Sequence, residues 1–136
     1  MQLQNKLLEI ISEIDRPEQW GIAQHNIGLT YTELFASQKD KFQSKIIDQA
    51  IYHLELSFTV RDPDDPDTLQ YWVASCRSLG EALIERSMQQ TNAQASNDLQ
   101  RAYEVLSGAA SRISEAEHPN QWTEVQQQLA RCANQR

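Results

Sequence analysis

Residues 16–34 read Arg16-Pro-Glu-Gln-Trp-Gly-Ile-Ala-Gln-His-Asn-Ile-Gly-Leu-Thr-Tyr-Thr-Glu-Leu34, and weaker copies of this stretch occur twice more in the chain. Trp20 recurs as Trp72 after 52 residues, and again as Trp122 after a further 50. The 52-residue shift superimposes further positions: Ile27 on Leu79, Gly28 on Gly80, Glu33 on Glu85, Ser44 on Ser96, Ile47 on Leu99, Ala50 on Ala102 and Leu54 on Leu106. Self-similarity at such a fixed period indicates a stack of repeated supersecondary units.

The apolar residues recur at steps of three and four, which predicts amphipathic helices. A leading helix is predicted over residues 2–14, where Leu3, Leu7, Ile10, Ile11 and Ile14 form the apolar stripe. Pro17 marks the start of the next helix, because proline is tolerated in a first helical turn. The third copy begins at His118-Pro-Asn-Gln-Trp122 and continues to Leu129 and Ala130. We therefore predict an all-α fold, an antiparallel helix-pair solenoid of about six helices.

This organisation predicts one helical-repeat domain over residues 1–136. A leading helix occupies residues 1–15, a first repeat 16–67, a second repeat 68–117 and a terminal half repeat 118–136. Gly28 is expected to let a neighbouring helix approach closely, since a glycine inside a helix costs about 0.5–1 kcal/mol relative to alanine and needs a packing reason. Trp20, Trp72 and Trp122 are expected to wedge between successive helix pairs, where their large apolar area would stabilise the stack.

Composition and charge exclude several function classes. The formal net charge of −7 and a pI near 4.9 disfavour binding to a phosphate backbone, which needs clustered Lys and Arg, so no nucleic-acid partner is predicted. No run of apolar residues approaches the length of a membrane span or a signal peptide, so we predict a cytoplasmic protein without a membrane partner. Cys76 and Cys132 are far apart, which predicts two reduced, packed thiols.

The pattern resembles the tetratricopeptide repeat family. Ile27-Gly28-x-x-Tyr31 and Leu79-Gly80-x-x-Leu83 match the first helix (helix A) of that repeat, and Ala50 and Ala102 match the second (helix B). Residues 15–31 look especially like the long variant repeats of bacterial proteins that also carry a CHAT-type protease domain. The 52- and 50-residue spacings exceed the usual repeat of about 34 residues, which predicts extended helices or connections.

The resemblance implies a groove, lined by one face of each helix A, that holds an extended peptide or a partner helix. The positions carried over to this chain are His25, Asn26, Leu29 and Glu33 in the first repeat, Arg77, Ser78, Glu81 and Glu85 in the second, and Gln127, Gln128 and Arg131 in the third. His25 is expected on the exposed side of its helix. The groove is therefore predicted to be polar and mixed in charge.

No residue pattern points firmly to catalysis, a metal or a cofactor. His25 has no serine or cysteine nucleophile in its own turn, and His53 and His118 are separated from each other and from cysteine pairs. The acidic run 62–67 contains Pro63 and Pro66 and lacks the glycine and final glutamate of a calcium loop, so it is interpreted as a solvated turn. No catalytic, metal-binding or cofactor-binding residue is predicted.

We predict a non-enzymatic module that binds a protein or peptide, with two alternatives left open. One is a regulatory or accessory unit of a bacterial enzyme system, such as a CHAT-type protease. The other is a structural homo-oligomer through the terminal helices, because a last helix with Val125, Leu129 and Cys132 on one stripe would normally bury that face against a helix B of its own. The same stripe would also fit a segment cut from a longer array of repeats.

Overall fold

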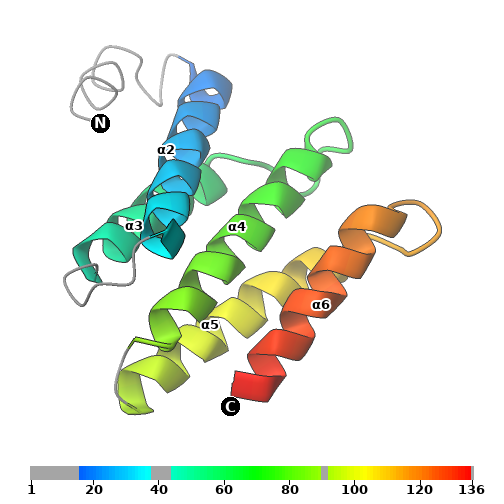
Figure 1. The fold of residues 1–136 in the computed structure, drawn as a ribbon. Coiled ribbons are helices and arrows are strands. Elements are labelled where there is room, and N and C mark those ends of the chain that lie inside the picture. The colour runs from blue at the N-terminus through cyan, green and yellow to red at the C-terminus, as the bar shows by residue number, and fades with distance from the viewer. Residues whose placement is uncertain (1–15, 38–43, 90–91, 136) are drawn as a thin grey trace. The chain divides into compact units, whose positions relative to one another are not determined.

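A computed structural model describes residues 16–37, 44–89 and 92–135, which fold into α-helices joined by turns and contain no strand. The five helices are α2 (Pro17–Ser37), α3 (Ser44–Thr59), α4 (Leu69–Ser87), α5 (Asn92–Ala110) and α6 (Pro119–Gln135) (Figure 1). The prediction of an all-α fold is confirmed for these residues. The leading helix predicted over residues 2–14 lies outside the described residues.

The helices are long, with 16 to 21 residues each. An average helix has about 11–12 residues, so helix length accounts for much of the long repeat spacing. The 52-residue shift fails at one helix start, because α5 begins at Asn92, a full turn before Ser96. Ser44 and Ser96, which the shift superimposes, therefore do not occupy equivalent places at the starts of α3 and α5.

The three tryptophans occupy the same place in their helices. Trp20, Trp72 and Trp122 are each the fourth residue, of α2, α4 and α6 respectively. At the two proline starts the backbone geometry is also shared: the amide of Trp20 donates to the carbonyl of Arg16 at 2.9 Å, and that of Trp122 to His118 at 2.8 Å. The repeated phrase Pro-x-Gln-Trp therefore folds in the same way twice.

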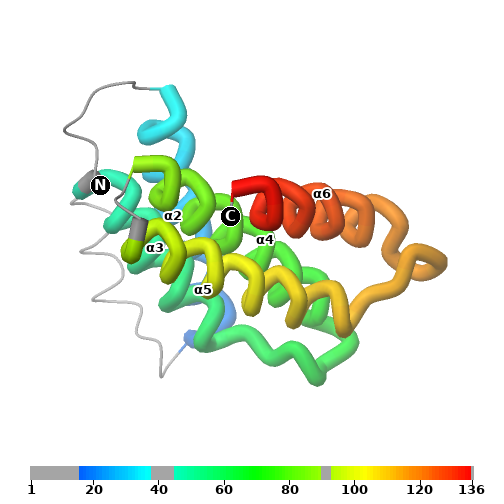
Figure 2. The backbone as a smooth tube through the Cα atoms, turned by 90° about the horizontal axis from the view of Figure 1, so that it is seen from below, coloured from blue at the N-terminus to red at the C-terminus, as the bar shows by residue number. Residues whose placement is uncertain are grey.

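The chain forms two compact units, residues 1–69 and 70–136. In the first unit, α2 and α3 run antiparallel to each other (Figure 2). A Cβ placed on Gly28 would lie 2.5 Å from Cγ of Leu54 and 3.2 Å from the carbonyl oxygen of Ala50. Gly28 therefore permits the close approach of α3 that its position in the sequence predicted.

The second unit repeats this contact and adds a third helix. A Cβ on Gly80 would lie 2.8 Å from Cγ of Leu106, so α4 and α5 meet through the residues 52 positions after Gly28 and Leu54. α6 packs on α5, where the thiol of Cys132 donates to the carbonyl of Leu99 at 3.1 Å. The described helices α4, α5 and α6 thus make a three-helix unit in which α6 runs parallel to α4 (Figure 1).

The equivalent apolar positions of the two pairs are buried in both. Ile27 and Leu79, Ile47 and Leu99, Ala50 and Ala102, and Leu54 and Leu106 are at most 4 % exposed. Trp20 and Trp72 are also buried, whereas Trp122 is half-buried. Trp72 lies within its own pair, near Gly108 of α5 and with the Arg112 guanidinium 5.7 Å from its ring centroid. That the tryptophans pack between successive helix pairs therefore stays a prediction.

Candidate functional site

A polar face between α4 and α6 brings together most of the predicted partner-binding residues of the second unit. Arg77, Glu81 and Glu85 follow one another at four-residue steps, which places them on one side of α4. Each reaches a polar side chain of α6, where the partners are Glu124, Gln128 and Arg131. We call these six residues the α4–α6 face.

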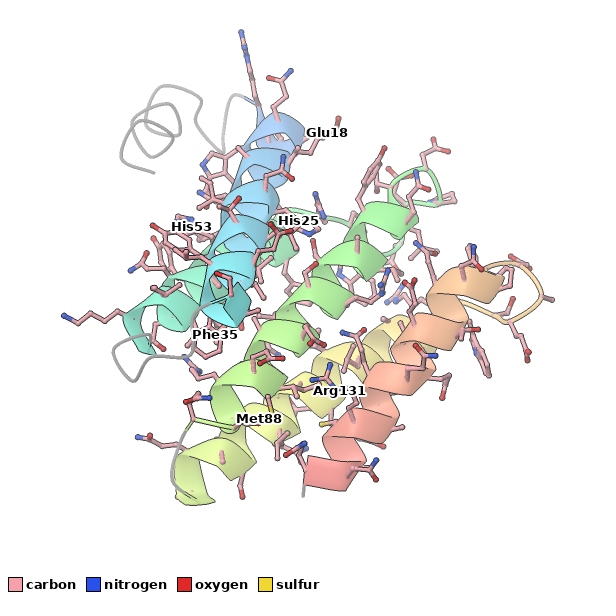
Figure 3. All side chains as sticks on the ribbon, viewed as in Figure 1. Glu18, His25, Phe35, His53, Met88 and Arg131 are labelled. Carbon is pink, nitrogen blue, oxygen red and sulfur yellow. The ribbon has the colours of Figure 1, made fainter. Side chains whose placement is uncertain are left out.

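Arg131 is the centre of the α4–α6 face, and it lies on α6 in Figure 3. Its Nη1 donates to both carboxylate oxygens of Glu81, at 2.7 and 2.6 Å, and its Nη2 lies 3.5 Å from Oε1 of Glu85. Glu81 thus takes the short contacts and Glu85 the long one. Hydrogen bonds between charged groups of this kind are shorter and stronger than those between neutral groups.

At the other end of the face, Arg77 makes two contacts with α6. Its guanidinium forms an ion pair with Glu124, and its backbone carbonyl accepts a hydrogen bond from Nε2 of Gln128 at 2.8 Å. The same Nε2 also lies 3.4 Å from Oε2 of Glu81. Two buried polar atoms of the face have no hydrogen-bond partner within the described part of the chain, Nε of Arg77 and Oε1 of Gln128.

The electrostatics of the face follow from burial and from an excess of carboxylates. Burial, together with the neighbouring charge of Glu81, raises the pKa of Glu85 above its ordinary value. The hydrogen bonds from Arg131 to Glu81 raise the pKa of that arginine, which stays protonated. Three carboxylates face two guanidinium groups, so the formal charge of the α4–α6 face is about −1 at neutral pH.

The predicted residues of the first repeat lie in a different environment. His25 is buried, 8 % exposed, so its expected location on the exposed side of α2 is wrong (Figure 3). Nη1 of Arg61 donates to its Nδ1 at 2.9 Å, which requires an imidazole that accepts at Nδ1. Burial and the Arg61 charge lower the pKa of His25 to about 4. The same helix exposes Asn26 and Glu33 and half-buries Leu29.

A second buried histidine, His53, belongs to a cluster of side chains that the sequence did not predict. Nδ1 of His53 donates to Oε1 of Gln24 at 2.5 Å, and both residues are buried. Tyr31 stacks on the His53 ring with centroids 5.9 Å apart, and Tyr52 meets it edge-on at 5.2 Å. Burial lowers the pKa of His53. Residues 29 positions apart in sequence meet here, and nothing in the local pattern of either helix could have joined them.

The remaining predicted residues and one unpredicted residue complete the site. Ser78 is half-buried on α4, and Gln127 is exposed on α6. Glu124 was not predicted, although it lies four residues before Gln128 and therefore on the same side of α6. This four-residue spacing could have identified Glu124 as a site residue from the sequence. The structure brings the second- and third-repeat residues together, with Ser78 and Gln127 outside the contacts described above.

Comparison of the chain with protein-family models, curated proteins and solved structures found no match. The site is therefore interpreted from its own residues.

Three further features bear on the possible chemistry. The described residues contain no group of three or more His, Cys, Asp or Glu side chains placed to hold a metal ion. In the acidic turn, the carboxylates of Asp62 and Asp65 accept hydrogen bonds from the amides of Asp64 and Asp67, each at 2.9 Å, as in a local turn. None of the helices in the described ranges is long and apolar enough to cross a membrane.

Proposed function

We propose that this chain is a tetratricopeptide-like helical repeat that binds a protein segment at the α4–α6 face, which two of its A helices form. α2, α4 and α6 take the helix-A positions, and α3 and α5 take the helix-B positions. The observation that carries the proposal is the repeated contact of Gly28 with Leu54 and of Gly80 with Leu106. Helix pairs that reuse one packing contact at a fixed period are the building unit of an α-solenoid.

The α4–α6 face supports the location of the binding surface. Two successive A helices present charged side chains that are only partly covered, with 31 % of the Arg77 side chain on α4 and 42 % of the Arg131 side chain on α6 exposed. The groups are held in place by their mutual ion pairs, so a partner would meet a pre-organised surface. Pre-organisation lowers the entropic cost of binding.

The ion pairs of the α4–α6 face limit which substitutions can test it. Replacing Arg77 and Arg131 by glutamate would place like charges against Glu124, Glu81 and Glu85, and it would destabilise the fold as well as alter the surface. An exchange of the two members of one pair avoids this. Arg77→Glu combined with Glu124→Arg retains an α4–α6 ion pair and the net charge, and it reverses the charges presented to a partner.

The experiment is affinity capture from the native host, followed by a binding measurement on the captured protein. The Arg77→Glu, Glu124→Arg exchange should weaken binding about tenfold or more while the thermal midpoint stays within a few degrees of the parent. The matched control exchanges two exposed charges at the start of α2, as Arg16→Glu with Glu18→Arg, and should bind like the parent. Equal binding by parent and Arg77/Glu124 exchange would contradict the proposed surface.

A further inference from the structure

The excess negative charge of the α4–α6 face lies at one of its ends. Arg77 and Glu124 pair with each other, which balances the charge at the first end. At the second end a single guanidinium, that of Arg131, is shared by Glu81 and Glu85. It donates to both oxygens of Glu81 at 2.7 and 2.6 Å, whereas it approaches Glu85 only to 3.5 Å. Glu85 is therefore the carboxylate of the face whose charge is neutralised least.

The helices of the face offer Glu85 no second cation. Arg131 is the one lysine or arginine of α6 between Pro119 and Gln135. On α4, Arg86 donates two hydrogen bonds to Asp98 of α5, and Arg77 pairs with α6 at the first end of the face. The position of Arg131 is fixed by the packing of α6 on α5. Glu85 thus keeps the long contact.

The α6 helix is anchored on α5 through its apolar side. Val125 and Cys132 are completely buried, and the Cys132 thiol donates to the carbonyl of Leu99 at 3.1 Å. The expectation that these two residues would need a helix B of their own is therefore wrong, because α6 already packs on α5. The charged side of α6 remains for Glu81 and Glu85.

An ionised Glu85 does not help the fold. It stands in the last turn of α4, which ends at Ser87, and the partial negative charge of a helix C-terminus disfavours a carboxylate there. Burial, and then the charge of Glu81, raise the pKa of Glu85. At neutral pH its ionised form is therefore less favourable to folding than its uncharged form. Residues that lower stability where they stand are often kept for function.

An exposed apolar side chain lies beside this carboxylate. The amide of Met88 donates to the carbonyl of Ile84 at 3.3 Å, which continues the helical turn of α4 past Ser87. Met88 therefore follows Glu85 by three residues on the same side of the helix. It is 46 % exposed, and its flexible thioether can adapt to an aliphatic chain laid against it.

We propose that the protein segment bound by the α4–α6 face carries a lysine or arginine whose charged group pairs with Glu85 and whose aliphatic stem packs on Met88. Long basic side chains join an apolar stem to a charged head, which matches the two neighbouring groups. An acidic segment would add charge where a carboxylate is already in excess, and an apolar one would bury Glu85 without a counter-ion. The inference rests on the proposed function and names the chemistry of its partner.

The probe is a library of random linear peptides displayed on phage and selected on the full chain at physiological salt. The retained peptides should share a lysine or arginine, and selection on Glu85→Gln should lose this preference, because glutamine keeps the size of the side chain and removes its charge. Glu85→Gln in the chain, or glutamine in place of the shared basic residue in the peptide, should each weaken binding about tenfold. The two changes together should weaken it little more, since they remove the same contact.

The matched control is Glu115→Gln, which removes the same charge at an exposed position in the turn between α5 and α6. It should bind the peptides like the parent. Equal weakening by both variants would mean that the peptides respond to the net charge of the chain, and it would overturn the inference. Circular dichroism should show a thermal midpoint for Glu85→Gln equal to that of the parent or higher. A marked fall would assign Glu85 to the fold and would also overturn the inference.

The remaining outcomes separate this inference from the proposed function. Peptides without a shared basic residue, or binding that Glu85→Gln leaves unchanged, would overturn the inference. The proposed function would still stand if the Arg77→Glu, Glu124→Arg exchange weakened the binding of those peptides. A selection that retains no peptide, or peptides insensitive to all of these changes, would contradict both.

Discussion

At the scale of single residues, the glycines show how the same residue type has different consequences in two places. A Cβ at Gly28 would lie 2.5 Å from the middle of the Leu54 side chain, whereas one at Gly108 would lie 3.6 Å from the ring of Trp72. The first distance requires α2 or α3 to move, and the second is an ordinary van der Waals contact. The gain in helix propensity from alanine is about the same at both sites.

We therefore expect opposite signs from two identical substitutions. Gly28→Ala should lower the free energy of unfolding by about 1–2 kcal/mol, because overpacking outweighs helix propensity. Gly108→Ala should raise it by about 0.5–1 kcal/mol. Urea denaturation followed by circular dichroism measures both. A stabilising Gly28→Ala would mean that α3 does not approach α2 as closely as described.

The buried His25 gives the stability a pH dependence of known sign. Its pKa is about 4 in the folded chain, below the ordinary value of 6.5, so the unfolded chain binds more protons between these limits. Stability is then full above pH 6.5 and decreases as the pH falls toward 4, by up to about 3 kcal/mol. His53, whose pKa is also lowered by burial, acts in the same direction.

The check is the free energy of unfolding measured from pH 7 to pH 4 for the parent and for His25→Asn. Asparagine can place an oxygen near the position of Nδ1 and accept from Arg61, but it does not titrate. The variant should show a flatter pH profile over this range. An unchanged slope would mean that other groups produce the acid sensitivity.

At the scale of helices, two kinds of ion pair connect neighbours. Arg86 binds Asp98 through two hydrogen bonds, Nε to Oδ2 at 3.0 Å and Nη2 to Oδ1 at 2.8 Å, and it joins the end of α4 to α5. The Asp98 side chain is only 9 % exposed. The Arg77–Glu124 pair between α4 and α6 is far more open, with 31 % and 46 % of the side chains exposed.

Double-mutant cycles to alanine should separate these pairs. The coupling energy of Arg86 with Asp98 is expected to be about 1–3 kcal/mol, because either single variant leaves a charge in a partly buried place. That of Arg77 with Glu124 should be below about 1 kcal/mol, since water screens exposed charges. Chemical denaturation at low and high salt provides the measurement. Equal couplings would mean that burial does not decide the strength of these pairs.

Helix positions were largely predictable and helix rotations were not. The apolar stripes and Pro17 predicted α2, and the repeat placed Gly80 at the position of Gly28, where the structure shows a matching close contact. The repeat does not give the start of α5, because the shift that aligns Leu54 with Leu106 does not constrain the polar residues before the helix. His25 was assigned to the wrong side of α2, since a neighbouring residue outside the helix, Arg61, supplies its partner.

At the scale of the whole chain, each of the two units has packing contacts of its own. The packing of α4, α5 and α6 described above involves only residues after 68, through Gly80 with Leu106, Arg86 with Asp98 and Cys132 with Leu99. A fragment of residues 68–136 should therefore show helical circular dichroism and a cooperative thermal transition. Its midpoint should be modest, because a domain of about 60–70 residues buries a smaller fraction of its surface on folding than a larger domain does. A non-cooperative melt would show that this unit needs the first.

The sequence by itself determined the helical class, the recurrence of a glycine that lets a neighbouring helix approach closely, and the residues available for a polar face. These depend on periodicity and residue size, which are local properties. The tertiary structure alone decided that Arg131 pairs with Glu81 and that His25 accepts from Arg61. Such pairings depend on how each helix is rotated against its neighbours, and that rotation is set by the sum of many side-chain contacts rather than by one segment.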